Sequence, residues 1–207
     1  MRISARESET VDGRALRSER SRHAIVTAFF ELIGGGNPQP TAQQVAAQAG
    51  VGLRSVFRHF EDMESLYAEL NERVQAAALP LLRDPPGAGT VEQRALEIVR
   101  HRSAFFEALS PFKRSGDIVR HRSVFLQRQH VGVVRELRER LLRGLPELAA
   151  APDAVTDALD AALSFEIWDR LRRDQRLSRE RATEALNTVA LALLARMGVT
   201  RRRPRAR

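Results

Sequence analysis

Residues 46–60 read AAQAGVGLRSVFRHF and place two arginines and a histidine on one short segment. Arg54, Arg58 and His59 carry nitrogen donors that phosphate oxygens and base edges can accept. Arginine is also the side chain that pairs best with guanine when a helix lies in the major groove of DNA. The segment therefore predicts a DNA-reading helix, whose outward side shows Leu53, Arg54, Ser55, Arg58 and His59.

The spacing of small and apolar residues before and after Gly50 and Gly52 fits a helix-turn-helix. This motif needs small residues where its two helices cross, and a residue that turns the chain at little cost between them. Val45 and Ala46 fall on the inner side of the first helix, and Ala49 and Gly50 form the turn. Val56 then returns an apolar side chain to the inner side of the second helix. The alternative is three packed helices that happen to carry charge.

Helical periodicity dominates the chain, and strand and hairpin signals are nearly absent. The patterns predict helices over about 16–33, after Thr41, over 53–59 and after Asp62, with Thr41 and Asp62 as N-caps. The stretch LPLLRDPPGAGT then sets a domain boundary near Leu79. Later helices are predicted from Thr90 to SPFKRSGD, over about 117–143, from Asp153 to about 174, and over 179–197.

These elements predict an all-α fold with four regions. They are a flexible N-terminal arm over 1–15, a helix-turn-helix DNA-binding domain with a connecting helix over 16–79, a larger helical ligand-binding and dimerisation domain over 80–200, and a basic disordered tail over 201–207. The first helical domain would hold the DNA-reading segment, and the second would control it.

The net charge favours a polyanionic partner but does not show which part of the chain binds it. The 207 residues have a formal net charge of +8 and a pI of about 11.3. Residues 1–80 hold 9 Arg against 10 Asp and Glu, a net of −1, whereas RRRPRAR at the end adds +5. Eight of the nine arginines of this region precede residue 61, whereas half of its ten acids lie at or after it, so one face of that region can still be positive.

Several classes of function are excluded or disfavoured by the residues present. The absence of cysteine excludes disulfides and thiolate metal sites. The chain lacks a glycine-rich phosphate loop, GxSxG and HExxH, and its histidines form no i, i+4 pair, so no enzyme, metal site or cofactor is expected. No apolar run approaches a membrane span and the start has no signal-like apolar core, so we expect a soluble, cytoplasmic protein.

The front of the chain resembles the tetracycline-repressor (TetR) family of bacterial transcription regulators. The resemblance covers roughly residues 17–72, from AIVTAFFELI through TAQQVAAQAGVGLRSVFRHFEDMESLYAEL. It implies about nine helices, of which the first three bind DNA, the others form a ligand pocket and the last two form a dimer interface. The expected DNA contacts are Arg17, Arg20, Thr41, Gln43, Gly52, Leu53, Arg54, Ser55, Phe57, Arg58 and His59.

Three positions depart from the family pattern. Phe57 replaces a common tyrosine, Met63 a frequent lysine and Gly52 a frequent serine, and each change removes a donor that would reach phosphate. Either the affinity of the chain for DNA is lower, or arginines substitute for these donors: Arg17, Arg20, Arg22 and Arg58. Met63 also continues the apolar face of its own helix.

Aromatic side chains of the second domain predict a cavity for a small-molecule effector. The candidates are Phe105, Phe106, Phe125, Phe165 and Trp168, with Gln129 and His130 as polar groups. The alternative interpretation of each aromatic residue is ordinary core packing.

Two amphipathic helices near the end of the chain predict a homodimer interface. The apolar residues are Leu163, Ile167 and Leu171 on one helix, and Leu186, Val189 and Leu193 on the other. Two copies would form a four-helix contact and space two reading helices along DNA. Part of this apolar surface is expected to close the core of its own domain.

The combined hypothesis is a homodimeric regulator that binds operator DNA and is released by an unidentified small molecule, and it is not an enzyme. A ligand can act in this way only if it binds the two states of the protein with different affinity. The alternative hypothesis is an all-α small-molecule-binding or interaction module that has lost specific DNA binding.

Overall fold

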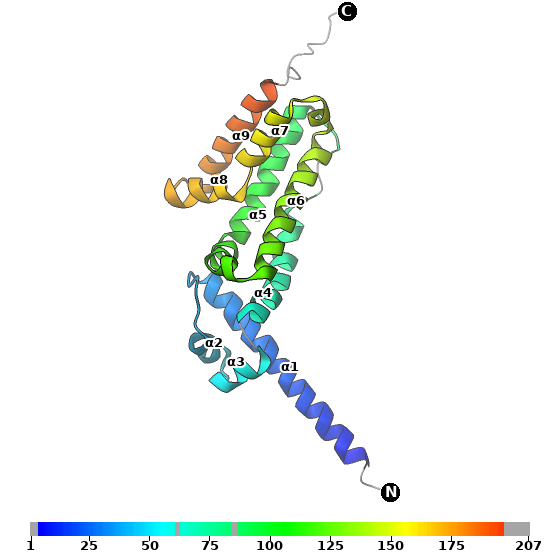
Figure 1. The fold of residues 1–207 in the computed structure, drawn as a ribbon, viewed down its shortest axis with the longest axis vertical. Coiled ribbons are helices and arrows are strands. Elements are labelled where there is room, and N and C mark those ends of the chain that lie inside the picture. Colours follow the sequence, from blue (N-terminus) through cyan, green and yellow to red (C-terminus); the bar gives the residue numbers. More distant parts are fainter. Residues whose placement is uncertain (1–3, 61–62, 84–86, 197–207) are drawn as a thin grey trace, which may run out of the picture. The chain divides into compact units, whose positions relative to one another are not determined.

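The computed structural model describes residues 4–60, 63–83 and 87–196, and within these ranges all regular secondary structure is helical (Figure 1). The all-α fold predicted from the sequence is confirmed. The chain divides into two compact units. Unit 1 is the chain up to Gln75 together with Pro111–Gln127, and unit 2 is Ala76–Ser110 together with the chain from Arg128 onward. Asp62, the side chain of Met63 and the predicted tail at 201–207 lie outside the described residues.

Unit 1 contains α1 (Ser4–Gly34), α2 (Ala42–Ala49), α3 (Leu53–His59) and most of α4 (Met63–Ala78). In Figure 1, α2 and α3 lie beside α1, and these three helices contact one another. The side chains that pack between the helices are apolar: Ile25, Phe29, Ile33, Val45, Val56, Phe60, Leu66 and Leu70. The predicted helices at the front of the chain are therefore confirmed, and their inner faces are the predicted ones.

The first helix begins at Ser4, well before residue 16, where the sequence predicts its start. Helical backbone thus covers most of the segment 1–15, for which the sequence predicts a flexible arm. Residues 4–15 contain no proline and include two Ala, two Arg and two Glu, which are favourable in helices. The apolar periodicity that guided the prediction begins only further along, where the helix packs.

Helix α5 (Val91–Val119) starts at the predicted N-cap Thr90 and runs through Pro111, so the predicted break at SPFKRSGD is wrong. The residues beyond the proline are held in unit 1 by packing. Phe112 stacks on Phe30 with ring centroids 4.5 Å apart, and the hydroxyls of Tyr67 and Ser115 lie 3.0 Å apart. A 3₁₀ turn (Arg120–Arg122) follows, and α6 (Val124–Gly144) begins later than the predicted helix.

Unit 2 contains the first part of α5, most of α6, α7 (Asp153–Ala162), α8 (Phe165–Asp169), a π-helical turn (Arg170–Asp174) and α9 (Arg179–Ala195). Two 3₁₀ turns complete it, Leu79–Leu81 and Pro146–Ala150. The single helix predicted over 153–174 is interrupted between α7 and α8. There Ser164 caps α8, because its hydroxyl accepts from the Ile167 backbone N–H at 3.5 Å.

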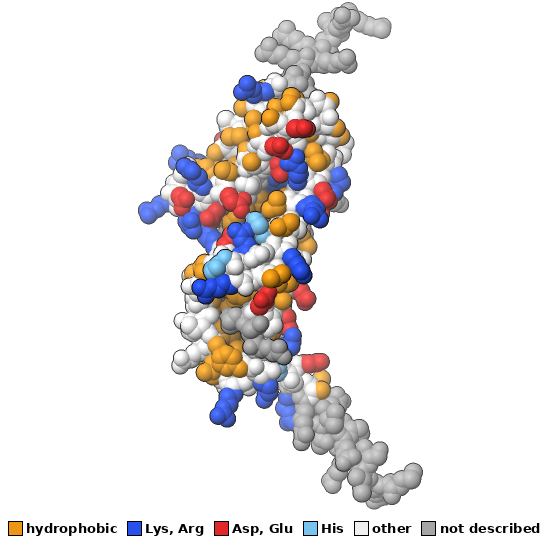
Figure 2. All heavy atoms as spheres, in the orientation of Figure 1, with side chains coloured by type: hydrophobic (Ala, Val, Ile, Leu, Met, Phe, Trp, Pro, Cys, Tyr) orange, Lys and Arg blue, Asp and Glu red, His pale blue; other side chains and the backbone are white. Residues whose placement is uncertain are grey.

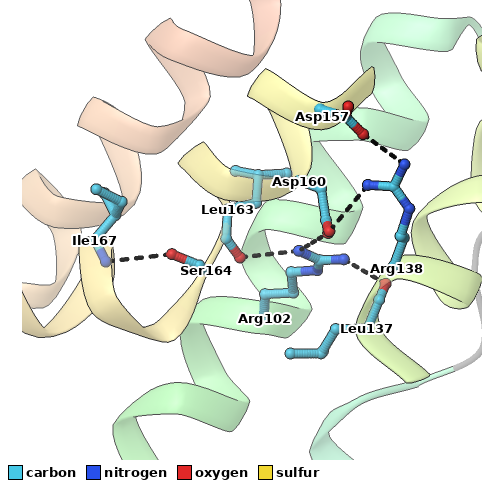
Figure 3. A network of polar contacts seen from close by, with 8 residues as sticks. All are labelled: Arg102, Leu137, Arg138, Asp157, Asp160, Leu163, Ser164 and Ile167. Atoms are coloured by element: carbon cyan, nitrogen blue, oxygen red, sulfur yellow. Dashed lines mark hydrogen bonds and ion pairs between the residues drawn. The ribbon is translucent and has the colours of Figure 1, made fainter. Parts of the chain in front are cut away.

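A buried arginine joins three helices of unit 2 (Figure 3). The side chain of Arg102 in α5 is only 2% exposed. Its guanidinium donates to the carbonyl oxygen of Leu163 at the end of α7 at 2.9 Å, and to that of Leu137 in α6. Burial lowers the pKa of Arg102 to about 10, so the group still carries its charge at neutral pH.

The charge of Arg102 is balanced by a carboxylate on α7. Asp160 lies 3.6 Å from the Arg102 guanidinium and 3.4 Å from that of Arg138, which also pairs with Asp157 at 2.6 Å. A buried cation is tolerated when it is paired and its donors are satisfied, and both conditions hold here.

Candidate nucleic-acid interface

The start of α2 is fixed by a capping box. The Thr41 hydroxyl accepts from the Gln44 backbone N–H at 3.2 Å, and the Gln44 side-chain oxygen accepts from the Thr41 backbone N–H at 2.9 Å. This confirms Thr41 as an N-cap and explains why the helix begins there. Thr41 and the neighbouring Gln43 are both exposed.

The turn between α2 and α3 depends on one glycine. Gly50 has a φ of +66°, in the left-handed region that side chains other than glycine rarely adopt. The Gly50 N–H donates to the Ala47 carbonyl at 3.2 Å, and the Val51 N–H donates to the Ala46 carbonyl at 3.0 Å. This is the hydrogen-bond pattern of a Schellman motif. It ends α2 sharply and directs the chain into α3.

Helix α3 buries one residue and exposes most of the others. Val56 lies in the core. Ser55 and His59 are half-buried, and the exposed residues of the segment are Gly52, Leu53, Arg54, Phe57 and Arg58. Gly52 is the N-cap but forms no side-chain cap. Of the residues predicted to face outward, Leu53, Arg54 and Arg58 are exposed, whereas Ser55 and His59 are half-buried.

The exposed face of α3 is positively charged. Arg54 and Arg58 are four residues apart and therefore lie on one side of the helix. Residues 53–59 contain no Asp or Glu. The Arg58 guanidinium lies 3.5 Å from the Ser55 hydroxyl, along the same face. Arg17 and Arg20 of α1 are also exposed. These side chains can bind an anionic partner without first breaking a buried ion pair.

Arg22 makes contacts within unit 1 that the sequence does not indicate. Its guanidinium pairs with Glu69 of α4, lies 5.1 Å from the centroid of the Phe60 ring, and is 3.5 Å from the His59 carbonyl oxygen. Arg22 thus ties α1 to α4 and to the end of α3. These contacts help to hold α3 in place within unit 1.

Unit 1 contains a hollow of about 350 Å³ that the sequence analysis does not predict. Its lining is mostly charged: Glu19, Arg22, His23, Val26, Glu69, Glu72 and Arg73. Arg73 is held there by the Thr27 hydroxyl at 2.6 Å and lies 5.5 Å from the centroid of the Phe30 ring. No signal in the sequence indicates this hollow, because its residues come from α1 and α4 and have no fixed spacing.

His59 is neutral at pH 7. Burial lowers its pKa from the ordinary value of 6.5, and the charges of Arg58 and Arg22 lower it further. Its Nε2 is buried and has no hydrogen-bond partner among the described residues. A neutral imidazole can offer one hydrogen bond but no charge, so any contact of His59 with a phosphate would be weaker than that of an arginine.

The aromatic residues predicted to line an effector cavity are mainly core residues of unit 2. Phe105, Phe106, Phe165 and Trp168 are all buried, and Phe106 packs between Phe105 and Phe165. Their burial agrees with the core-packing alternative. Phe125 belongs to unit 1, whereas Gln129 and His130 are half-buried residues of α6 in unit 2.

The residues predicted for a dimer interface divide into three sets. Leu163 and Leu186 are buried in the core of their own chain, so they are not available to a partner. Leu171 and Leu193 are half-buried against this core. Ile167 in α8 and Val189 in α9 are 38% and 41% exposed. Only the last two keep the exposure that a partner helix would need.

None of the helices in the described ranges is both long and apolar enough to cross a membrane. In the same ranges, no three side chains of the His, Cys, Asp and Glu types come together as a candidate metal site.

Comparison with known proteins supports the fold. No family model matches the chain, and no curated protein matches its sequence. Among solved structures, the chain is similar to a transcriptional regulator from Rhodococcus sp. Rha1, with a TM-score of 0.66 and 17% sequence identity. The similarity covers 87% of this chain and 99% of the regulator. The two proteins therefore share their fold over nearly the whole regulator.

Proposed function

We propose that this protein is a DNA-binding regulator of transcription of the TetR type. The observation that carries the proposal is the face of α3. Arg54 and Arg58 are exposed there without a neighbouring carboxylate in the helix, and the helix begins three residues after the left-handed Gly50 that ends α2. A helix presented in this way can enter the major groove, with arginines directed at guanine edges and phosphates.

Two further observations support the proposal. The front of the chain resembles the TetR family over residues 17–72, and the fold is shared with a solved transcriptional regulator. Thr41, Gln43, Arg17 and Arg20 are exposed, as contacts to the DNA backbone must be. In this interpretation Arg54 and Ser55 read bases, whereas Arg58 and the exposed side chains of α1 and α2 position the protein on phosphates.

The protein acts as a homodimer in this proposal, and a small effector releases it from operator DNA. The exposed apolar side chains Ile167 and Val189 support a partner contact on α8 and α9. An Ile167→Arg/Val189→Arg double variant should shift the molecular mass in light scattering from dimer to monomer. An unchanged mass would place the interface elsewhere. The effector would bind in unit 2, and Gln129 and His130 are its candidate polar contacts.

DNA binding by the full chain is the direct test. The protein is titrated by fluorescence anisotropy against duplexes from the region upstream of its own gene, at several salt concentrations. We expect a specific complex whose affinity falls steeply with salt, because phosphate contacts release counterions. An Arg54→Ala/Arg58→Ala double variant should bind at least about 10-fold more weakly, since a bidentate base contact of Arg54 contributes about 1–3 kcal/mol and the phosphate contact of Arg58 is lost as well.

A matched control removes the same charge elsewhere. Arg170 and Arg181 are exposed arginines of unit 2, and an Arg170→Ala/Arg181→Ala variant should bind these duplexes like the wild type. Equal affinity of the wild type and the α3 double variant would contradict the proposal. It would favour the alternative function, a small-molecule-binding or interaction module without specific DNA binding.

A further inference from the structure

Helix α3 exposes an apolar pair beside its arginines. Phe57 is 60% exposed and Leu53 is 44% exposed. They are four residues apart, so their side chains lie next to each other on one side of the helix. Figure 2 shows hydrophobic side chains beside Lys and Arg side chains on the surface over α2 and α3. The helix thus presents an apolar row, Leu53 and Phe57, parallel to a basic row, Arg54 and Arg58.

The apolar row has no role in the core of unit 1. Val56 and Phe60, each 2% exposed, already provide the buried side chains on the inner side of this segment. A polar residue at position 57 would leave this packing intact. Phe57 is also the most exposed large apolar side chain in the described part of the chain. Such exposure costs the free protein favourable apolar burial, which a partner can restore.

The basic row decides what kind of partner covers the apolar row. Residues 53–59 carry two arginines and no acid, so a second copy of the same face would be repelled. A polyanion is attracted by the same charges. DNA is the polyanion that also offers apolar groups in a groove wide enough for a helix, because each thymine displays its C5-methyl group in the major groove.

We infer that Leu53 and Phe57 are specificity-determining residues that contact thymine C5-methyl groups. This inference rests on the proposed function and deepens it. Phe57 has no hydrogen-bonding group, so it cannot recognise a base edge by donors or acceptors. Its contribution to specificity would come from covering a methyl group, which distinguishes thymine from cytosine and from uracil. In the neighbouring row, Arg54 contacts base edges and Arg58 contacts phosphates, as proposed above.

The experiment compares thymine with uracil in one DNA sequence. The full-length protein first selects duplexes from a random-sequence pool. The winning duplex is then synthesised with thymine and with uracil, which differs only in the missing methyl group. We expect the wild type to bind the thymine duplex about fourfold more tightly for each methyl group it covers.

Variants assign this preference to the apolar row. Phe57→Ala should lose the part of the preference that Phe57 supplies, and Leu53→Ala/Phe57→Ala should bind both duplexes alike. Phe57→Leu should keep part of the preference that Phe57 supplies because it keeps an apolar side chain. Val131→Ala is the matched control. Val131 is an exposed apolar residue of α6 in unit 2, and its replacement should leave the ratio of the two affinities unchanged. Thermal unfolding should be the same for all of these variants, because the replaced side chains are exposed.

The outcomes separate the inference from the function on which it rests. Selection of a duplex with equal affinity for its thymine and uracil forms would overturn the inference and leave DNA binding in place. Failure to enrich any duplex would overturn both. A change from dimer to monomer in Phe57→Ala, with the thymine preference retained, would show that the apolar row joins two copies of the chain, and this too would overturn the inference.

Discussion

The arginines of α3 and those of unit 2 differ in what they bind. Arg94, Arg102, Arg140 and Arg172 of unit 2 each donate to a backbone carbonyl oxygen of their own unit. Arg54 and Arg58 of α3 are exposed, and within the described part of the chain no carboxylate pairs with them. The same residue type therefore stabilises the fold in one region and remains available to a partner in the other.

This difference explains why net charge is a poor guide to the binding surface. Residues 1–80 have a net charge of −1, yet this part of the chain contains the exposed basic row. Unit 2 is rich in arginine, but many of its guanidinium groups are neutralised by nearby acids, as Arg172 is by Glu107 at 2.6 Å. The role of each arginine depends on whether it pairs within the fold or remains exposed. Replacing arginines of the two kinds should therefore have different effects on stability and DNA binding.

Replacing Arg102 should have the largest effect on stability. In Arg102→Leu, the carbonyl oxygens of Leu163 and Leu137 lose their donor, and Asp160 loses one of its two cations. Loss of a buried ion-pair partner costs about 3–5 kcal/mol. Chemical unfolding followed by circular dichroism measures this. Arg100→Ala, an exposed arginine of the same helix, should stay within about 0.5 kcal/mol of the wild type. Equal unfolding midpoints for the two variants would contradict the structural role of Arg102.

Arg22 should affect both stability and DNA binding. Arg22→Ala removes the ion pair with Glu69 and the contact with the Phe60 ring, and we expect a loss of about 1 kcal/mol in the free energy of unfolding. DNA affinity should fall as well, because the end of α3 is held less firmly. Arg20→Ala should weaken DNA binding without lowering stability. If both variants lost stability equally, the assigned difference between these two arginines would be wrong.

Gly52→Ser should modestly raise both the stability of the protein and its affinity for DNA. A Cβ atom at Gly52 would meet no neighbouring atom within 4 Å, and the backbone φ of −69° suits any residue. A serine there can cap α3, which adds a few tenths of a kcal/mol to stability. Its hydroxyl can also donate to phosphate, so DNA affinity should rise by a factor of about 2–10. A drop in affinity would show that DNA approaches this backbone too closely for a side chain.

The smallest effect is expected from the titration of His59. Its pKa is lower in the folded chain than the unfolded value of 6.5, so the unfolded chain binds more protons in this range. This contribution to stability is complete above pH 6.5 and decreases as the pH falls towards the folded pKa. His59→Gln should flatten this part of the profile of unfolding free energy against pH. Identical profiles for wild type and variant would show that His59 is not perturbed.

The sequence predicted the front of the molecule well because local signals define it. Thr41 with Gln44, and Gly50 between α2 and α3, encode the ends of these helices within a few residues. The outward side of α3 then follows from the position of Val56. The contacts of Arg22 with Phe60 and Glu69 could not be predicted, because these residues are far apart in the chain and leave no periodic signal.

The second half was predicted less well for the same physical reason. Pro111 indicates a helix end locally, but packing of Phe112 on Phe30 keeps α5 helical beyond it. The aromatic residues of unit 2 could line a cavity or fill a core, and their composition alone does not distinguish the two. In the structure, the complete burial of Phe106 and Trp168 favours the interpretation that these aromatic residues fill the core.

Hydrogen–deuterium exchange of the full chain with and without its selected duplex tests the central claim most directly. If the face of α3 binds DNA, backbone amides across α2 and α3, residues 41–59, should become protected, whereas those of α7 and α9 should exchange as before. Binding of the duplex without protection of residues 41–59 would contradict the account.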